Sequence, residues 1–584
     1  MNSRIDAITV EVINQSLAGI VQEMQNSLFC TGYSTIIRES RDASCAIMNA
    51  QGQVMAQHTV LPLHLGAFPA CTEHILAAYS AADMQDRDSF VVNHPYFGGS
   101  PHATDVALIS PILVDGELFG FSGSIAHKSD IGGLVPGTNS GQAREIFHEG
   151  IMIPPVRFTR AGEPVREVET ILRANSRTPD LVIGDLRGQL GATLLGAERV
   201  RRICEKYTAQ TVLLASERLF VQTERRVRAA VASWPDGIYT GQARLHDDAI
   251  EGGQPVHIRV RVTIAGEGIN FDFRGSDDQV QGPFNIRPPL VRAVCYYCLK
   301  CLIDPVLPSN AGLAAAVDAQ FRPASLVCPE LPAPVNTYMP VAVATAEAVF
   351  DALSSAVPRA RIAESSSGTN GTLSHARTRR GYPQVQYELP AGAIGARANG
   401  DGVSASKAHV ANGSLTPIEI LETEFPIEVT RFELVRDSGG AGRQRGGLGY
   451  VREYRMLGES TFATRGAKQL TPPAGRAGGL PGSLSRLVVN PGTASERVVV
   501  SRDGNVKLGP GDVLRIEQAG GGGYGDPRTR SAERVLADVR EGYVSPEAAR
   551  DVYGVHVVLD DDGRTWRTAE TAATRLYEKD AHAS

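Results

Sequence analysis

The chain has 584 residues, of which 42% are hydrophobic and 21% are charged, and its formal net charge at pH 7 is −6. These values are ordinary for a globular protein with one or more sizeable cores, and they give no reason to expect a nucleic-acid-binding surface. No apolar run approaches the length of a transmembrane helix and the N-terminus lacks the layout of a signal peptide, so we expect a cytoplasmic enzyme subunit with no membrane partner.

The first part of the chain alternates between helix and strand patterns. Two apolar runs, 106–113 and 118–125, flank Asp115-Gly116 and predict an antiparallel hairpin with its turn at that dipeptide. The elements expected before this hairpin are an amphipathic helix over 7–30, a hairpin over 43–56, a helix over 66–81 and a strand that begins at Ser89.

The rest of the chain changes composition several times. Residues 165–235 read as long helices, residues 257–264 alternate strictly between apolar and polar, and helices are expected over 290–303 and 341–356. From residue 430 the chain is rich in glycine and strand-like, with a polar amphipathic helix over 532–540 near its end. We therefore predict a multi-layer, multi-domain α+β chain with a helical middle segment and a glycine-rich β C-terminal region. The expected units are 1–160, 161–235, 236–430, 431–530 and 531–584.

Two histidines and two aspartates in the first quarter form a candidate metal site. Asp105 enters the 106–125 hairpin and His127 leaves it, so antiparallel pairing brings the two residues together. His102 lies in the loop that enters the same pair, and Asp42 stands at the mouth of the earlier hairpin. A nitrogen and oxygen ligand set of this kind suits one divalent ion, zinc or manganese, and leaves room for water. This points to hydrolytic or carboxylating chemistry, although polar loop residues and a turn aspartate are the plain alternative.

Several other residues are weaker candidates. His64 either lines the same pocket or serves as a core or helix-capping histidine. Asp130, His148 and Glu149 are candidate catalytic groups for proton transfer, and the sequence does not choose among them. The glycine-rich stretch 519–525 lacks the Gly-x4-Gly-Lys-Ser/Thr pattern, and no such phosphate loop occurs in the chain.

A series of motifs, in order along residues 6–556, resembles the hydantoinase B family. That family includes subunits of N-methylhydantoinases and of caprolactamase, the C-terminal half of 5-oxoprolinase, and the metal-binding subunit of ketone carboxylases. The motifs that carry the resemblance are Arg41-Asp42-x-Ser44-Cys45-Ala46, Asn93-x-Pro95-Tyr96-x-Gly98-Gly99, Ala126-His127-x-x-Asp130-Ile131-Gly132-Gly133, Glu145-Ile146-Phe147-x-Glu149-Gly150, Thr416-Pro417-x-Glu419, Asp437-Ser438-Gly439-Gly440-Ala441-Gly442-Arg443 and Gly521-Gly522-Gly523-Tyr524-Gly525-Asp526-Pro527.

The resemblance implies both a ligand set and a division of labour. The four positions that bind a metal in the family fall on Asp42, His102, Asp105 and His127. A separate hydantoinase A-type ATPase subunit would use ATP to phosphorylate a small cyclic amide. This chain would then hydrolyse the activated ring, in a complex that holds two copies of each subunit.

Two alternatives and two departures accompany this implication. The runner-up activity is ATP-dependent carboxylation of a ketone such as acetone or acetophenone, but the carboxylases carry Glu at the position of Asp42, which favours the hydrolase. A chain that only presents the ATPase subunit, with no metal, is the non-enzymatic alternative. Lys128 and His94 stand where many family members carry His and Asp.

Overall fold

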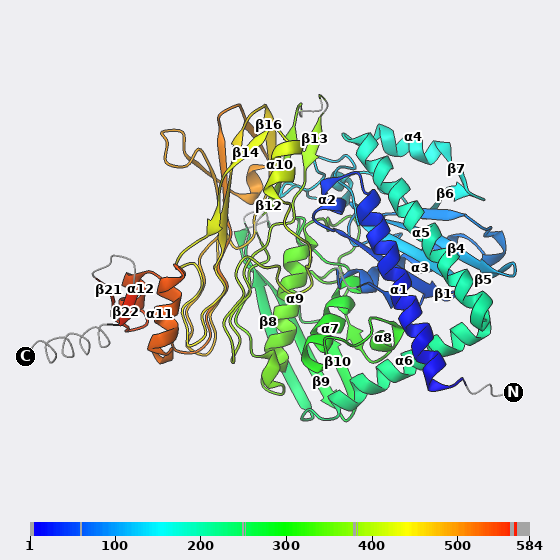
Figure 1. Ribbon diagram of the computed structural model, residues 1–584, viewed down its shortest axis with the longest axis horizontal. Coiled ribbons are helices and arrows are strands. Elements are labelled where there is room, and N and C mark those ends of the chain that lie inside the picture. The colour runs from blue at the N-terminus through cyan, green and yellow to red at the C-terminus, as the bar shows by residue number, and fades with distance from the viewer. Residues whose placement is uncertain are drawn as a thin grey trace, which may run out of the picture.

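The computed structural model describes residues 5–58, 61–247, 250, 253–368, 370–377, 381, 383–560 and 566–568. Helices and several separate sheets form a multi-layer α+β fold, as the sequence predicted. The N-terminal elements lie at one side of the molecule, and the last helices, α11 (Ala532–Arg540) and α12 (Pro546–Asp551), lie at the opposite end (Figure 1). Part of the expected 531–584 unit, residues 561–565 and 569–584, falls outside the described residues.

A seven-stranded antiparallel sheet contains both predicted hairpins. Its strand order is β2-β1-β5-β4-β3-β6-β7. The β4–β5 turn lies at Asp115-Gly116, whose φ angles of 52° and 83° are those that a type I′ hairpin turn needs. The strands are β1 (Ala43–Asn49), β2 (Val54–Gln57), β3 (Ser89–Val92), β4 (Asp105–Val114), β5 (Glu117–His127), β6 (Val156–Arg160) and β7 (Glu163–Pro164).

Helices cover both faces of this sheet, so alternate residues of a strand meet different helices. Cys45 of β1 belongs to the core that includes α1 (Ala7–Thr31), whereas the next residue, Ala46, belongs to the core that includes Phe68 of α3 (His64–Ala78). All seven apolar residues expected on one face of the first helix are buried, which confirms its amphipathic pattern. They are Val10, Ile13, Leu17, Ile20, Val21, Met24 and Leu28.

Helices and a second sheet form the middle of the chain, as expected from the patterns after residue 165. Strand β9 buries Ile258, Val260, Val262 and Ile264 in alternation, which confirms the predicted period of two. Helix α9 packs against β8 and β9 of the sheet β11-β10-β9-β8. The elements are α2 (Thr35–Arg38) before the first sheet and, after it, α4 (Arg166–Ala174), α5 (Pro179–Tyr207), α6 (Ala209–Val231), β8 (Gly237–Leu245), β9 (Val256–Ala265), β10 (Gly268–Asp272), α7 (Pro288–Ile303), α8 (Ala311–Ala315), β11 (Asp318–Gln320) and α9 (Tyr338–Leu353).

The C-terminal part contains two larger sheets, a small two-stranded sheet and closely packed glycine-rich segments. A Cβ atom on Gly446 would lie 2.0 Å from the carbonyl oxygen of Gly521, so the two backbones touch where a side chain has no room. The sheets are β13-β12-β16-β19, β14-β15-β20-β17-β18 and a small β21-β22 pair. The elements are β12 (Asn370–His375), β13 (Gln384–Gln386), α10 (Ile418–Glu424), β14 (Ile427–Leu434), β15 (Tyr450–Met456), β16 (Ser460–Arg465), β17 (Arg486–Val489), β18 (Arg497–Val499), β19 (Asn505–Leu508), β20 (Val513–Glu517), β21 (Val557–Leu559) and β22 (Trp566–Thr568).

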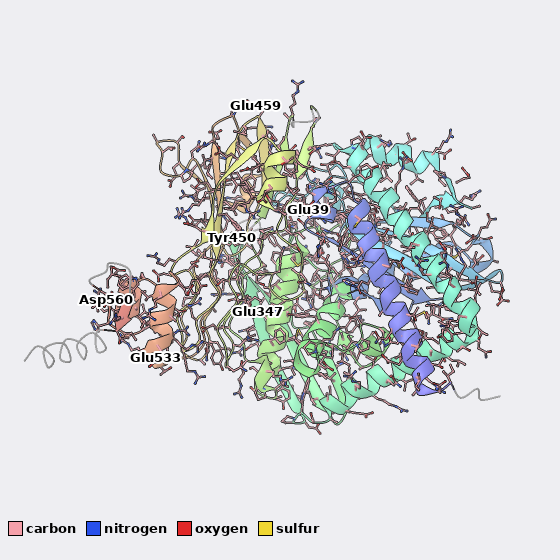
Figure 2. The ribbon with its side chains drawn as sticks, viewed as in Figure 1. Glu39, Glu347, Tyr450, Glu459, Glu533 and Asp560 are labelled. Carbon is pink, nitrogen blue, oxygen red and sulfur yellow. The ribbon has the colours of Figure 1, made fainter. Side chains whose placement is uncertain are left out.

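The largest hydrophobic core joins the first sheet to the middle of the chain. It contains Phe68 of α3, Phe271 of β10, Val294 of α7 and Val349 of α9, so it spans the expected units 1–160 and 236–430. Side chains fill the space between the ribbons, and Glu347 on α9, labelled in Figure 2, is a buried acidic residue. Among the described residues, no helix combines the length and apolar character needed to cross a membrane.

Candidate metal centre

Three adjacent strands place three of the four predicted ligands in a row. Asp105 of β4 is the cross-strand partner of His127 of β5. On the other side of β5, the backbone N–H of His127 donates to the carbonyl oxygen of Asp42, the residue before β1, over 3.1 Å. Side chains at these positions point to the sheet face that α3 covers, because they share the alternation of Ala46. Sheet register therefore fixes the spacing of the three side chains.

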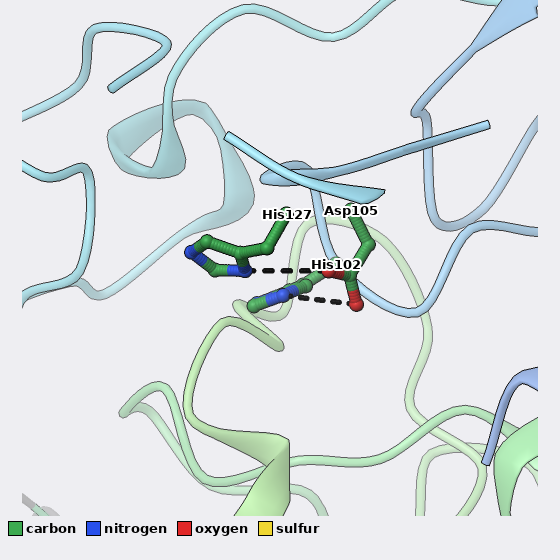
Figure 3. Close-up of side chains that lie close together, drawn as sticks. All are labelled: His102, Asp105 and His127. Carbon is green, nitrogen blue, oxygen red and sulfur yellow. Dashed lines mark hydrogen bonds and ion pairs between the residues drawn. The ribbon is translucent and has the colours of Figure 1, made fainter. Parts of the chain in front are cut away.

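His102 reaches the same point from the loop before β4. The backbone N–H of Asp105 donates to the His102 carbonyl over 3.1 Å, which folds the loop back on the strand. The His102 Nε2 atom lies 3.1 Å from Asp105 Oδ2, and His127 Nδ1 lies 3.2 Å from Asp105 Oδ1 (Figure 3). The Asp42 carboxylate is further out, with its Oδ2 3.9 Å from His127 Nδ1.

The donor atoms fit a divalent metal ion. One ligand atom from each of His102, Asp105 and His127 lies within 4.8 Å of the others, and all three side chains are buried. Ligands about 2.1 Å from a tetrahedral ion are roughly 3.4 Å apart, close to the separations in this cluster. Buried carboxylates and imidazoles that face one another without a cation would also carry a large desolvation cost. The cluster can therefore hold one metal ion through nitrogen and oxygen donors.

His64, the first residue of α3, lies at the same site. Its Nε2 atom is 3.7 Å from Asp105 Oδ2, and its side chain is buried. Its Nδ1 atom is also buried, with no hydrogen-bond partner among the described residues. Of the two roles weighed from the sequence, the structure places His64 in the pocket.

The pKa values of the Asp42 and Asp105 carboxylates are shifted in opposite directions. Burial raises the pKa of Asp42 above its usual value. Burial acts in the same direction on Asp105, but the charge of His102 and hydrogen bonds from the surrounding histidines outweigh it and hold the pKa of Asp105 well below the usual range. Asp105 is therefore the stable anionic centre of the cluster, with histidines on three sides.

A cavity lies directly beside this cluster. Asp42, His64, His102 and His127 form its polar end, and Lys407 places a cation on its wall. Much of the remaining wall is apolar and keeps the ligands away from bulk water. The apolar wall residues are Leu61, Leu63, Met339, Pro340, Leu389, Pro390, Ala411 and Ala467.

Two tyrosines that the sequence did not single out pack on the candidate ligands. The Tyr338 hydroxyl donates to Asp105 Oδ2 over 3.2 Å, and its ring meets the His102 ring edge-on, with centroids 4.9 Å apart. The Tyr387 ring lies 4.5 Å from the His127 ring, and its hydroxyl accepts from Asn139 Nδ2. These residues, and Lys407, lie more than 200 positions from the ligands, and no local pattern marks them.

The three proton-transfer candidates do not line this cavity. The buried Asp130 carboxylate accepts from the backbone N–H groups of Gly132, Gly137 and Arg177, so it organises a loop. His148 is partly exposed, with Nδ1 accepting from the backbone of Arg144. Glu149 is buried but faces the backbone N–H groups of residues 335 and 336. The structure therefore places none of the three on the cavity wall.

The two departures from the family pattern also point away from the cavity. Lys128 is buried on the opposite sheet face, where its Nζ donates to Gln189 Oε1 of α5 over 2.5 Å. His94 accepts through Nδ1 from the backbone N–H groups of Tyr96 and Phe97. Neither residue alters the wall of the candidate site.

Comparison with known proteins settles the family. The model of the hydantoinase B/oxoprolinase family matches residues 6–527. The chain belongs to this family. Its relatives in the hydantoinase B family include a protein of Pseudomonas sp. strain NS671 described as the putative B-type component of a D-/L-hydantoinase, which is 31% identical over 96% of this chain and 96% of that protein.

The beta chain of the caprolactamase of Pseudomonas jessenii is 31% identical over 98% of this chain and 99% of that one. A crystal structure of the ATP-dependent caprolactamase from P. jessenii has a TM-score of 0.89 with this hydantoinase B-family chain at 27% identity, covering 98% of it and 99% of that chain. A nucleotide-free acetone carboxylase structure has a TM-score of 0.86 at 19% identity, covering 99% of this chain and 84% of that one, and shows a common fold. The family resemblance drawn from the motifs is thereby confirmed.

Proposed function

We propose that this chain is the metal-dependent hydrolytic subunit of an ATP-dependent cyclic amidohydrolase. Its substrate would be a lactam or hydantoin that a hydantoinase A-type ATPase partner has activated by phosphorylation. The convergence of two aspartates and two histidines beside a cavity carries this proposal. Similarity to a hydantoinase component and to a caprolactamase component supports the substrate class.

The ligand set would be Asp42, His102, Asp105 and His127, with zinc or manganese as the ion. Such an ion, when bound, lowers the pKa of a water ligand toward 7 and so supplies hydroxide at neutral pH. Two anionic carboxylates offset its charge, so the site as a whole stays near neutral.

The remaining cavity residues would handle the activated substrate. Lys407 would pair with the phosphate group, which gains charge as it leaves the substrate carbon. Tyr338 holds Asp105 through its hydroxyl and fixes that carboxylate while the substrate exchanges with product. The apolar wall would hold the ring and keep out water that would otherwise hydrolyse the activated amide unproductively. Overall, the phosphorylated ring and two water molecules would give a carboxylic acid, an amine and inorganic phosphate: the ring carbon–nitrogen bond breaks, oxygen takes its place on the carbon, and the nitrogen takes up the protons from water.

The decisive experiment is an assay of this chain co-purified with its ATPase partner. Hydantoins, 5-oxoproline, lactams and simple ketones would be tested with and without ATP, and with bicarbonate for the ketones. ATP-dependent ring opening of a cyclic amide supports the proposal. Carboxylation of a ketone with no ring opening would replace it with the carboxylase alternative, and a complex with no bound metal and no activity on any of these substrates would favour a scaffold.

A further inference from the structure

Glu149 has no place in the proposed chemistry, yet its carboxylate is fully buried and is separated from the candidate ligand His102 by one residue, Asn336. It ends the short helical turn η2 (Ile146–Glu149), which lies outside the cavity wall. We infer that Glu149 is a positioning residue that acts through Asn336 to hold His102 as a metal ligand. This inference rests on the metal site of the proposed function and assigns it a supporting residue.

The first link joins Glu149 to the segment before α9. One carboxylate oxygen accepts from the backbone N–H of Asn336 over 2.7 Å, and the other accepts from the backbone N–H of Val335 over 3.1 Å. Two donors on two oxygens are the arrangement that an ionised carboxylate satisfies, because it has only acceptors. The contact spans 187 positions of sequence between Glu149 and Asn336, and so ties together segments that have no local connection.

The second link joins Asn336 to His102. The Asn336 carbonyl oxygen lies 3.0 Å from His102 Nδ1, and the Asn336 side-chain Oδ1 lies 2.5 Å from the same nitrogen. The amide orientation is supported because Asn336 Nδ2 donates to the Thr138 carbonyl over 3.1 Å. Two acceptor oxygens at Nδ1 require that this nitrogen carry the proton.

The consequence falls on the other ring nitrogen. With the proton on Nδ1, the Nε2 lone pair of a neutral His102 points to the cluster, 3.1 Å from Asp105 Oδ2. A metal-binding histidine commonly donates through its second nitrogen to an oxygen acceptor, which fixes its tautomer and its ring orientation. Asn336 supplies that acceptor, and Glu149 fixes where Asn336 sits.

The same segment delivers a second contact. Tyr338 follows Asn336 by two residues, begins α9, and donates through its hydroxyl to Asp105. A shift of the backbone at 335–336 would therefore disturb both His102 and Asp105. Glu149 controls two ligands of the cluster from a single buried position.

The test compares Zn²⁺ affinity in Glu149→Gln and in a matched control, Glu145→Gln. Glu145 lies just before the same turn, is partly exposed and pairs with His148. Each protein is stripped of metal, titrated with Zn²⁺ against a chromophoric chelator, and checked by circular dichroism. We expect Glu149→Gln to weaken Zn²⁺ binding about 10- to 100-fold and the control to bind like the parent chain. Glutamine has nearly the size and shape of glutamate and keeps one acceptor oxygen, so this variant is expected to fold.

The Co²⁺-loaded proteins give a second measurement that a general loss of packing would not mimic. A displaced His102 changes the ligand field, so the visible bands of Glu149→Gln should shift while those of Glu145→Gln should not. Asn336→Ala removes the side-chain acceptor of His102 and the side-chain donor to Thr138, and it leaves the backbone acceptor in place. It should change the same bands, and it serves as the test if Glu149→Gln does not fold.

The inference would be overturned if Glu149→Gln binds Zn²⁺ with the affinity of the parent chain and shows the same Co²⁺ bands. If only Asn336→Ala folds, the same result in that variant would overturn it. The variant His102→Ala separates this failure from failure of the proposed function. If His102→Ala loses Zn²⁺ and Glu149→Gln retains it, the metal site stands and the supporting role of Glu149 is wrong. If His102→Ala also retains Zn²⁺, the metal site itself is wrong.

Discussion

His127 Nδ1 lies 3.2 Å from Asp105 Oδ1, and the two residues are cross-strand partners in β5 and β4. Backbone hydrogen bonds of the sheet therefore hold the two side chains together, whether or not an ion lies between them. Loss of one ligand should empty the site without loosening the strands that carry it.

The first prediction follows from this arrangement. His102→Ala and His127→Ala should each release most of the bound ion while the protein stays folded, because each change removes a donor at the end of a strand or in a loop. Elemental analysis of dialysed protein measures the metal, and circular dichroism measures the fold. His148→Ala, a partly exposed histidine outside the cavity, is the control. Full metal content in both ligand variants would refute the assignment.

The second prediction concerns the cation in the cavity. Lys407→Met should lower kcat/KM for ring opening by the assembled complex on the order of 100-fold, because it removes a charge placed to stabilise the leaving phosphate. Metal content should not change. Lys507→Met is a matched control, since Lys507 lies on β19 and pairs with Thr461 outside the cavity. Equal losses in the two variants would argue against phosphate recognition by Lys407.

The third prediction separates the two half-reactions. Purified alone, this chain should neither hydrolyse ATP nor open a ring, because its sequence has no phosphate loop and its substrate arrives already activated. Phosphate release and ring-opened product are measured with and without the partner. Robust ATP turnover by the isolated chain would contradict the division of labour. A metal-ligand variant purified in parallel is the control, because ATP turnover by that inactive variant would reveal a contaminating ATPase.

The fourth prediction concerns assembly. A phosphorylated amide is short-lived in water, so the chain should form a stable complex with its ATPase partner, with two copies of each. Stable obligate interfaces often bury more than about 2,000 Å². Co-expression followed by size-exclusion chromatography with light scattering gives the stoichiometry. Two separately eluting proteins that are active only on added phosphorylated substrate would mean that the intermediate diffuses between them.

The fifth prediction is a pH dependence of stability caused by His375 on β12. Burial lowers the pKa of His375 to about 4. The unfolded chain, with a histidine pKa of about 6.5, binds more protons between these values, so this residue makes stability fall as pH drops from about 6.5 toward 4. His375→Gln removes the effect. Between pH 7 and pH 5 the parent protein should lose about 2 kcal/mol more unfolding free energy than the variant.

Denaturant unfolding at the two pH values measures this difference. His148→Gln is the control, because His148 is partly exposed and lies far along the chain from β12. An identical pH dependence in His375→Gln and the parent chain would show that His375 is protonated in the folded protein as readily as in the unfolded one.

Local patterns predicted the part of the site that strand pairing builds. The turn at Asp115-Gly116 determined the hairpin, and the hairpin brought Asp105 beside His127, so both the fold and the contact followed from adjacent sequence. The pairing of β1 with β5, which adds Asp42, joins two hairpins that lie far apart in the sequence, and no local pattern predicted it.

The rest of the site comes from contacts between distant segments. Asn336 and Tyr338 meet the ligands only because the segment before α9 packs against the loop before β4. Neither residue type nor spacing signals such a meeting in one sequence. Asp130 is the reverse case, in which the sequence suggests a role that the contacts do not support. An aspartate in a motif close to a candidate ligand suggests catalysis, but its carboxylate oxygens accept hydrogen bonds from the backbone N–H groups of a loop.

His127 and Lys128, at the end of β5, point to opposite faces of the sheet. This makes the site sensitive to small insertions and deletions. A residue added at Asp115-Gly116 lies at the far end of the hairpin and would only lengthen the turn. A residue deleted from the part of β5 next to the site would exchange the two faces, turning an imidazole toward Gln189 and an ammonium group toward Asp105. Length variation among homologues should therefore be tolerated at the tip of this hairpin and excluded near its base.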